Sequence, residues 1–224
     1  MIADSERLCR KLYGFVLEAD RKAAAELLGL AVSEYGYPAV ISEILNTVLW
    51  RVGEQFQKDK LSLAQGYVAG KIAEDMLERM DASTNGLKIP VETCGSAVIG
   101  NAEDDYHALG RSMLGTFLRI NCWNVIDLGN DVPAPAFVDT AVDSGARVIG
   151  VSAMMLTNAR NIAKVRLEID RRGLAGRIKL AVGGAVFVLR PELMSEVGAD
   201  GTVATAMEAP ELFKRLCMET REAI

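Results

Sequence analysis

The sequence predicts an α/β protein in which a helical bundle precedes a parallel sheet covered by helices on both faces. Apolar residues recur at helical spacing from Ser5 to about Asp81, whereas short apolar runs alternate with amphipathic segments after that point. The intervening stretch 81–86 is polar and lacks apolar anchors, so it is the best candidate for a linker. We therefore expect two domains, a helical one at residues 1–85 and an α/β one at residues 86–224.

The helical prediction rests on apolar stripes whose members stand three or four positions apart, as one face of a helix requires. The stripes are Leu8, Leu12, Phe15 and Val16, then Ile41, Ile44, Leu45, Val48 and Leu49, then Val68, Ile72, Met76, Leu77 and Met80. The periodicity pauses at 35–38, which contain Gly36 and Pro38, and again at 58–60. These breaks predict four or five short helices in a small bundle.

The sheet prediction rests on five apolar runs, each followed by an amphipathic segment. The runs are 94–99, 125–128, 148–151, 178–182 and, more weakly, 201–204; the segments are 109–118, 135–142, 158–171, 191–197 and 209–223. Repeated β-then-α units predict a five-stranded, doubly wound parallel sheet of the flavodoxin-like, or Rossmann-like, kind. Ligands of such sheets bind beyond the carboxyl ends of the strands, near the point where the strand order reverses.

Charge and hydropathy exclude several classes of protein. The 224 residues carry 25 Lys and Arg against 30 Asp and Glu, and the net charge of −5 argues against a broad nucleic-acid-binding face. No uncharged apolar run approaches the ~20 residues of a membrane span, and no leader segment opens the chain. We expect a cytoplasmic protein with no nucleic-acid or membrane partner.

The rare residues restrict the chemistry further. With a single His, the chain cannot build a zinc or iron site that needs several histidines. The four cysteines, at positions 9, 94, 122 and 217, form no C-x-x-C pair, and we expect them to be buried small hydrophobic residues in a reducing compartment. Chemistry must then come from carboxylates, from His107 or from a cofactor.

Common motifs of α/β folds are missing. The sequence has no G-x-G-x-x-G, no G-x-x-x-x-G-K-[ST] and no G-x-S-x-G, so dinucleotide, nucleotide-phosphate and serine-hydrolase sites are not supported. A phospho-receiver would need an Asp at the end of the third strand, where this chain has Ser152.

One string does follow the first predicted strand, D-x-H-x-x-G at Asp105, His107 and Gly110. Read alone, it describes either a solvated polar loop or an Asp105 that caps the next helix. Its position favours a site, because Ser152 ends the third predicted strand and the pair Gly183 and Gly184 ends the fourth. All of these residues would meet at one edge of a parallel sheet.

This combination resembles the cobalamin-binding pattern of the methionine synthase and mutase type. The pattern is D-x-H-x-x-G, then S-x-L about forty residues later, then G-G; here the second element reads Ser152, Ala153 and Met154. The helical half is similar to the cap that precedes this domain in corrinoid proteins of methyltransferase systems, chiefly at residues 52–56 and 61–65. The two likenesses cover nearly the whole chain.

The resemblance implies a role for each motif residue. His107 would replace the cofactor's own benzimidazole as the lower axial ligand of cobalt, the base-off/His-on form, and Asp105 would fix its tautomer. Ser152 would hydrogen-bond the displaced tail in its slot. Gly110 would allow close backbone approach, as would Gly183 and Gly184 along the tail, where a Cβ would clash. No residue of the chain is assigned a catalytic role of its own.

The sequence departs from the family pattern at several positions. Met154 replaces the leucine of S-x-L, a swap of similar volume that should still line the slot. Asn158 stands where members often have Ser or Thr; it can still hydrogen-bond Asp105 but cannot donate a hydroxyl proton. Trp50 and Tyr67 would cover the upper corrin face, although ordinary bundle core is an equally good interpretation for Trp50.

The resemblance implies a protein that carries a methyl group on cobalamin, cycling between methylcobalamin and cob(I)alamin, rather than a complete enzyme. Its partners would be a substrate-specific methyltransferase, a second methyltransferase that accepts the group, and a reductive activase. The methyl donor would be methanol, a methylamine or a methoxylated aromatic. Two alternatives stay open: a cobalamin-dependent sensor or regulator, and the small subunit of an adenosylcobalamin mutase, although mutase subunits generally lack the cap.

Overall fold

The computed structural model describes residues 2, 4–58, 60–83 and 93–220. The chain divides into two compact units, Met1–Val91 and Glu92–Ile224. The boundary between them falls within 84–92, outside the described residues, and so does the second half of the predicted linker. The helix that precedes this gap continues to Ser83, so the prediction that the linker begins at Asp81 is wrong.

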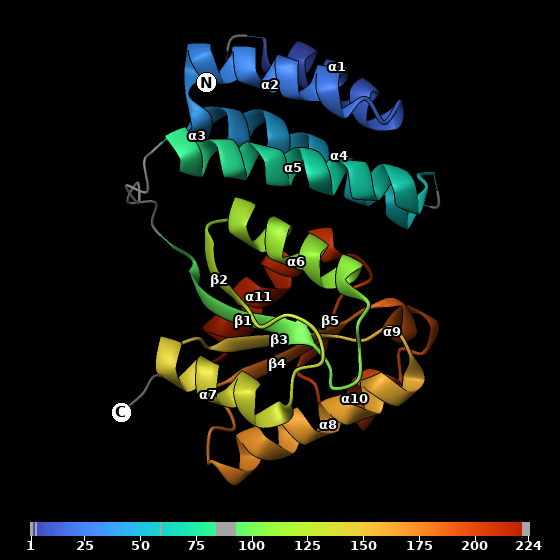
Figure 1. The fold of residues 1–224 in the computed structure, drawn as a ribbon, viewed down its shortest axis with the longest axis vertical. Coiled ribbons are helices and arrows are strands. Elements are labelled where there is room, and N and C mark those ends of the chain that lie inside the picture. The colour runs from blue at the N-terminus through green and yellow to red at the C-terminus, as the bar shows by residue number, and fades with distance from the viewer. Residues whose placement is uncertain (1, 3, 59, 84–92, 221–224) are drawn as a thin grey trace. The chain divides into compact units, whose positions relative to one another are not determined.

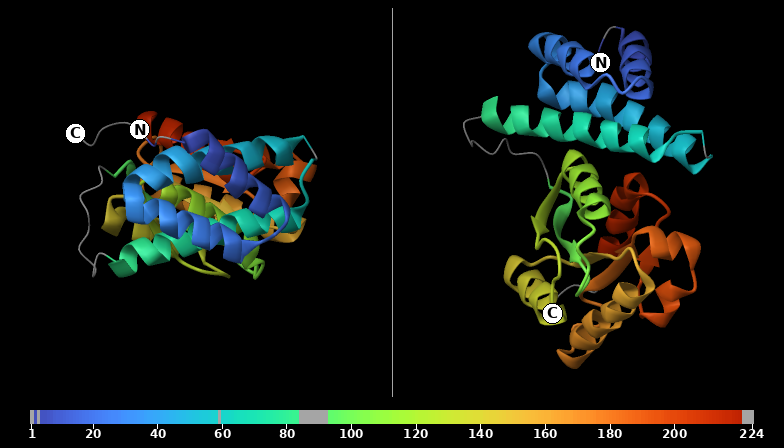
Figure 2. Two further views of the ribbon diagram at one scale, coloured as in Figure 1. Left: turned by 90° about the horizontal axis from the view of Figure 1, so that it is seen from above. Right: turned by 45° about the vertical axis from the view of Figure 1, so that its right-hand side comes forward.

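The first unit is a helical bundle, as predicted. Its elements are α1 (Ser5–Leu17), α2 (Arg21–Tyr35), α3 (Tyr37–Val40), the π-helical turn η1 (Ile41–Leu45), α4 (Asn46–Gln57) and α5 (Leu63–Ser83). Within the bundle α1 and α2 form one layer, and the run from α3 to α4 packs beside α5 in the other (Figures 1 and 2).

Local signals explain where the bundle helices begin and end. The Asp20 side chain accepts a hydrogen bond from the Ala23 backbone at 2.9 Å and so caps α2. Gly36, at φ 79°, ends α2, and Pro38 fits the first turn of α3. The second apolar stripe, from Ile41 to Leu49, is wholly buried although it runs through the π turn, which a 3.6-residue period does not predict.

The second unit is a five-stranded sheet in which all paired strands are parallel. The strands are β1 (Gly95–Asn101), β2 (Trp123–Asp127), β3 (Val148–Ser152), β4 (Lys179–Gly183) and β5 (Gly201–Thr202). Their spatial order is β2-β1-β3-β4-β5. The chain therefore adds β2 on one side of β1 and then β3, β4 and β5 on the other, so the strand order reverses between β1 and β3. The predicted doubly wound, flavodoxin-like fold is confirmed.

Helices cover both faces of this sheet (Figure 1). They are α6 (Ala108–Ile120), α7 (Ala134–Ser144), α8 (Leu156–Arg171), α9 (Ala185–Leu189), α10 (Leu193–Glu196) and α11 (Ala209–Met218), with a 3₁₀ turn η2 (Ala206–Glu208). Phe137 of α7 and Ile162 of α8 belong to the hydrophobic core on one face. Leu118 of α6 and Phe213 of α11 belong to the core on the other.

The boundaries of several predicted elements need correction. Helix α9 was not predicted, because five residues are too few to show a helical period. The last strand is only Gly201–Thr202, half of the predicted run. Helix α11 ends at Met218, short of the predicted residue 223, which lies outside the described residues. In the described part of the chain, no helix has the length and apolar content to cross a membrane.

Candidate functional site

The candidate site lies at the carboxyl edge of the sheet, where the strand order reverses between β1 and β3. The register aligns the last residues of three neighbouring strands, Asn101 with Ser152 and Ser152 with Gly183. The loop after β1 carries Asp105 and His107 to the same edge, where Met154 follows β3. The structure therefore brings these predicted site residues together, as parallel strands require.

Asp105 is the centre of the hydrogen-bond network at this edge. Its side chain is 1% exposed, and its Oδ1 accepts from the His107 backbone at 2.8 Å and lies 3.0 Å from His107 Nδ1. Asn101 Nδ2 reaches the same oxygen at 3.4 Å, and the Met154 backbone donates to Oδ2 at 2.7 Å. Four N–H groups thus offset the loss of hydration that a buried carboxylate suffers.

His107 presents the opposite picture, because its side chain is 52% exposed. An ionised carboxylate only accepts hydrogen bonds, so the nitrogen facing Asp105 must carry the proton. In a neutral imidazole the lone pair then belongs to Nε2, which points away from Asp105 and is available to a metal. The alternative that Asp105 merely caps α6 is wrong, since no side chain caps that helix at His107.

Asn101, and not Asn158, supplies the side-chain amide beside Asp105. Asn158 is buried in α8, and no hydrogen bond joins it to Asp105 within the described residues, which corrects the expected contact. Asn101 was missed, although a fully buried Asn at the end of an apolar strand is itself a signal, because such a polar group needs a partner.

A second carboxylate, Asp131 in the loop after β2, fixes the loop that carries His107. Asp131 accepts from the Tyr106 hydroxyl at 2.6 Å and from the Asp104 backbone at 2.9 Å. Its own backbone N–H donates to the Asp105 carbonyl at 3.1 Å. Hydrogen bonding lowers the pKa of Asp131, through Tyr106 first and Asp104 second. The loop also holds Asp104 at φ 66°, a left-handed conformation that needs such support.

Ser152 and Gly110 face each other across this edge. A Cβ added to Gly110 would stand 3.5 Å from Ser152 Oγ, an ordinary contact. Ser152 is 8% exposed, and its hydroxyl has no hydrogen-bond partner among the residues that the structure describes. The absence of a side chain at Gly110 therefore leaves the Ser152 hydroxyl open to a hydrogen bond from a ligand.

The two neighbouring glycines after β4 differ in what they face. A Cβ on Gly183 would meet nothing within 4 Å. A Cβ on Gly184, at φ 111°, would stand 2.1 Å from the backbone oxygen of Ala153. A Cβ at Gly184 would therefore clash with the protein's own backbone, and this position needs glycine whether or not a ligand is bound. Gly183 leaves open space.

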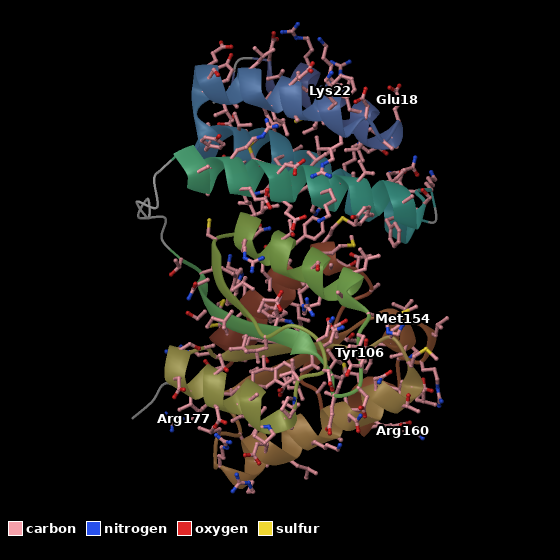
Figure 3. The ribbon with its side chains drawn as sticks, viewed as in Figure 1. Glu18, Lys22, Tyr106, Met154, Arg160 and Arg177 are labelled. Atoms are coloured by element: carbon pink, nitrogen blue, oxygen red, sulfur yellow. The ribbon has the colours of Figure 1, made fainter. Side chains whose placement is uncertain are left out.

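The other residues singled out by the sequence are more exposed than expected. Met154 is 47% exposed, and it lies with Tyr106 at the same edge of this unit (Figure 3). Trp50 in α4 is 71% exposed, so the bundle-core interpretation of Trp50 is wrong.

The cysteines are not fully buried either, since Cys94 is exposed and the other three are half-buried. No cluster of three His, Cys, Asp or Glu side chains suited to a metal occurs among the described residues.

Comparison with known families identifies the type of domain that carries this edge. A family model described as "B12 binding domain" matches residues 95–212, which include the sheet and every motif residue. The chain belongs to the B12-binding domain family. A second model, also described as a B12 binding domain, matches residues 8–80 of the helical unit. Cobalamin is therefore the cofactor of this protein, as the motif predicted.

Relatives of this B12-binding protein are corrinoid proteins. It is 28% identical over 200 residues to trimethylamine corrinoid protein 1 of Methanosarcina mazei, covering 89% of this chain and 92% of that protein. It is 30% identical over 202 residues to a corrinoid protein of Desulfitobacterium hafniense, covering 90% and 89% of the two chains. Among solved structures, the methanol:cobalamin methyltransferase complex of Methanosarcina barkeri matches with a TM-score of 0.69 at 22% identity, over 96% of this chain and 81% of that one.

The residues at the carboxyl edge fit a corrinoid. A single exposed imidazole is enough for an axial ligand, because the corrin ring itself supplies four nitrogens to the metal. The open space at Gly183 and the free hydroxyl of Ser152 suit the close approach of a ligand's polar tail.

Proposed function

We propose that this protein carries a methyl group on cobalamin bound in the base-off/His-on form, with His107 as the axial ligand of cobalt. The observation that carries the proposal is the pair formed by buried Asp105 and exposed His107, whose Nδ1 lies 3.0 Å from Oδ1 at the switch point of the sheet. When bound, cobalamin supplies a cobalt centre that accepts a methyl group from one molecule and gives it to another.

Asp105 holds the imidazole in the tautomer that ligation needs. Its carboxylate keeps a proton on Nδ1, and its second oxygen is fixed by the Met154 backbone at 2.7 Å. Asn101 and the His107 backbone restrain the first oxygen. A carboxylate held at both oxygens cannot rotate away, so the ring orientation is set before the cofactor binds.

Ser152, Gly110 and Gly183 form the entrance for the displaced tail of the cofactor. The Ser152 hydroxyl, without a protein partner in the described residues, would donate to the tail or accept from it. The missing side chain at Gly183 leaves space at the end of β4. Met154, half-exposed after β3, would add an apolar contact and the buried Asn158 of α8 a polar group, while Gly184 lies against the backbone of Ala153.

A methylamine is the methyl donor that the comparisons favour. The curated relatives include trimethylamine corrinoid protein, and a chain of similar fold occurs in a complex described as methanol:cobalamin methyltransferase. We therefore propose three cytoplasmic partners: a methyltransferase specific for a methylamine, a second methyltransferase that takes the group, and a reductive activase.

The single His makes the ligand assignment directly testable. In protein labelled with ¹⁵N-histidine, only His107 carries the label. The EPR spectrum of the cob(II)alamin form should show coupling to one nitrogen as a triplet in unlabelled protein and as a doublet in labelled protein. His107→Ala, which holds no histidine, should lose the coupling to a protein nitrogen altogether. A triplet that the label does not alter would identify the cofactor's own benzimidazole as the ligand and would contradict the proposal.

A second experiment tests the carrier role. The reconstituted, reduced protein is mixed with a methylamine methyltransferase and its substrate, and uptake of the methyl group is followed by absorbance. Uptake by the wild-type chain that is at least tenfold slower in His107→Ala supports the carrier. Light-driven cleavage of the cobalt–carbon bond that changes the oligomeric state, without uptake from any methylamine, would favour a sensor instead.

A further inference from the structure

Two cysteines lie opposite each other at the amino ends of β1 and β2, the sheet edge away from His107. The register pairs Gly95 with Trp123, and one position earlier the Cys94 backbone N–H donates to the Cys122 carbonyl at 3.0 Å. Neighbouring strands lie about 4.8 Å apart, within the ~4.4–6.8 Å between Cα atoms that a disulfide spans.

The backbone turns at the start of both strands: Cys122, just before β2, has φ 63°, and Gly95, the first residue of β1, has φ 132°. Ser96 and Asn124 are the register pair two positions further along, and the Asn124 amide donates to Ser96 Oγ at 3.1 Å. The nearness of the two cysteines rests on the backbone hydrogen bond between them and on the charge of Cys94, which raises the pKa of the Cys122 thiol.

The two thiols also differ in access. Cys94 is exposed and Cys122 is half-buried, and both are free. Burial raises the pKa of the Cys122 thiol, and the nearby Cys94 adds to this effect through its charge. Cys94 is therefore the thiol that a reagent in solution meets first. Cys122 is the thiol that then attacks the mixed disulfide formed on Cys94.

We propose that Cys94 and Cys122 form a redox-active pair that is oxidised to a disulfide by a low-molecular-weight disulfide, such as oxidised glutathione. The Cys94 thiolate attacks one sulfur of the reagent, forms a mixed disulfide and releases one thiol. The Cys122 thiolate then displaces the second thiol and forms the internal S–S bond. Overall, two protein thiols and one small disulfide give one protein disulfide and two small thiols, which take up the two protons.

The other two cysteines do not compete for this pair. Cys9 belongs to the helical unit, where its Sγ lies 3.6 Å from the Glu43 carbonyl oxygen. Cys217, in α11, packs against the hydrophobic core that contains Trp123. The proposal is thus specific to one of the six possible pairings of four cysteines.

Trypsin mapping tests the pairing on the full chain, because each cysteine falls in a separate tryptic peptide. Cys94 lies in residues 89–111, Cys122 in 120–147, Cys9 in 8–10 and Cys217 in 216–221. After incubation with oxidised glutathione and digestion without reductant, mass spectrometry should find 89–111 joined to 120–147, and dithiothreitol should separate them. The oxidised protein should melt about 5–10 °C higher than the reduced protein, since the bond closes a loop of 27 intervening residues.

Cysteine variants supply the matched controls. Cys217→Ser, a half-buried cysteine of the same unit, should leave the linked peptide unchanged, whereas Cys122→Ser should abolish it and leave Cys94 as a stable mixed disulfide with glutathione. Disulfide-linked dimers that depend on Cys94 but not on Cys122 would overturn the proposal. So would a wild-type protein in which 89–111 and 120–147 stay unlinked while Cys94 is modified.

Discussion

The two ends of β1 differ in what their polar side chains contact. At the carboxyl end, one buried carboxylate, Asp105, accepts from four N–H groups, which come from β1, from its own loop and from the second residue after β3. At the amino end, the Cys94 and Cys122 backbones are hydrogen-bonded, but neither thiol takes part in a comparable network.

The difference explains what each edge can do. A side chain held by several hydrogen bonds has one orientation, which is what a metal ligand needs in advance of binding. Two thiols without such bonds keep their freedom to react with each other. This contrast matches the two proposals, a cofactor held at the carboxyl edge and a thiol pair that reacts at the amino edge.

The largest expected effect on stability comes from replacing Gly184, and the neighbouring Gly183 should not share it. Gly184→Ala places a Cβ 2.1 Å from the Ala153 carbonyl oxygen, a backbone atom, at a position whose φ of 111° already disfavours a side chain. We expect it to lower the free energy of unfolding by at least about 3 kcal/mol, measured by urea denaturation of the apoprotein.

Gly183→Ala is the matched control, because its Cβ would enter open space. We expect its unfolding free energy to stay within about 1 kcal/mol of the wild type. Its affinity for cobalamin should fall about tenfold or more, measured by absorbance titration, because the methyl group would occupy space used by the cofactor. Equal destabilisation by both substitutions would show that the two positions do not differ in this way.

An intermediate effect is expected for Asp105→Asn. The new amide NH₂ must face an N–H group, either that of Met154 or those of His107, so one buried donor loses its acceptor. We expect a loss of about 1–3 kcal/mol in the free energy of unfolding and a ten- to hundredfold weaker affinity for cobalamin. Asp104→Asn, the same change at the exposed neighbouring position, should alter neither quantity measurably.

The smallest effect concerns the Tyr106–Asp131 pair and the pH. Because the folded protein lowers the pKa of Asp131, ionised Asp131 stabilises the fold above its ordinary pKa of 3.8, and this contribution is lost as the pH falls further. Tyr106→Phe removes the largest cause of the lowered pKa. Melting temperatures measured from neutral to acidic pH should therefore decline slightly less steeply below pH 3.8 in the variant. Parallel profiles would mean that this bond does not contribute to stability.

Much of the site could be read from periodicity and spacing. The alternation of apolar runs and amphipathic segments placed Asp105 and His107 after β1, Ser152 at the end of β3 and Gly183 at the end of β4. These positions follow from local patterns, because a strand's length and its place in a βα repeat are written in consecutive residues.

The contacts around Asp105 could not be read in the same way. Asn101 ends a strand and Asn158 lies near the start of a helix, and the family resemblance pointed to Asn158, which makes no hydrogen bond with Asp105 in the described part of the chain. Only the register of β1 and the path of its loop bring Asn101 within reach of the carboxylate. A hydrogen bond depends on distances of a few tenths of an ångström, which sequence spacing does not fix.

The sequence by itself therefore determined the fold class and, through its resemblance to a known family, the cofactor; it also holds a single imidazole, that of His107. The tertiary structure decided which oxygen holds that imidazole, which of two adjacent glycines the backbone needs, and which two cysteines lie opposite each other. The physical reason is the same in each case. Element types follow from local periodicity, whereas these contacts join residues of different elements, and their distances exist only once the strands are in register.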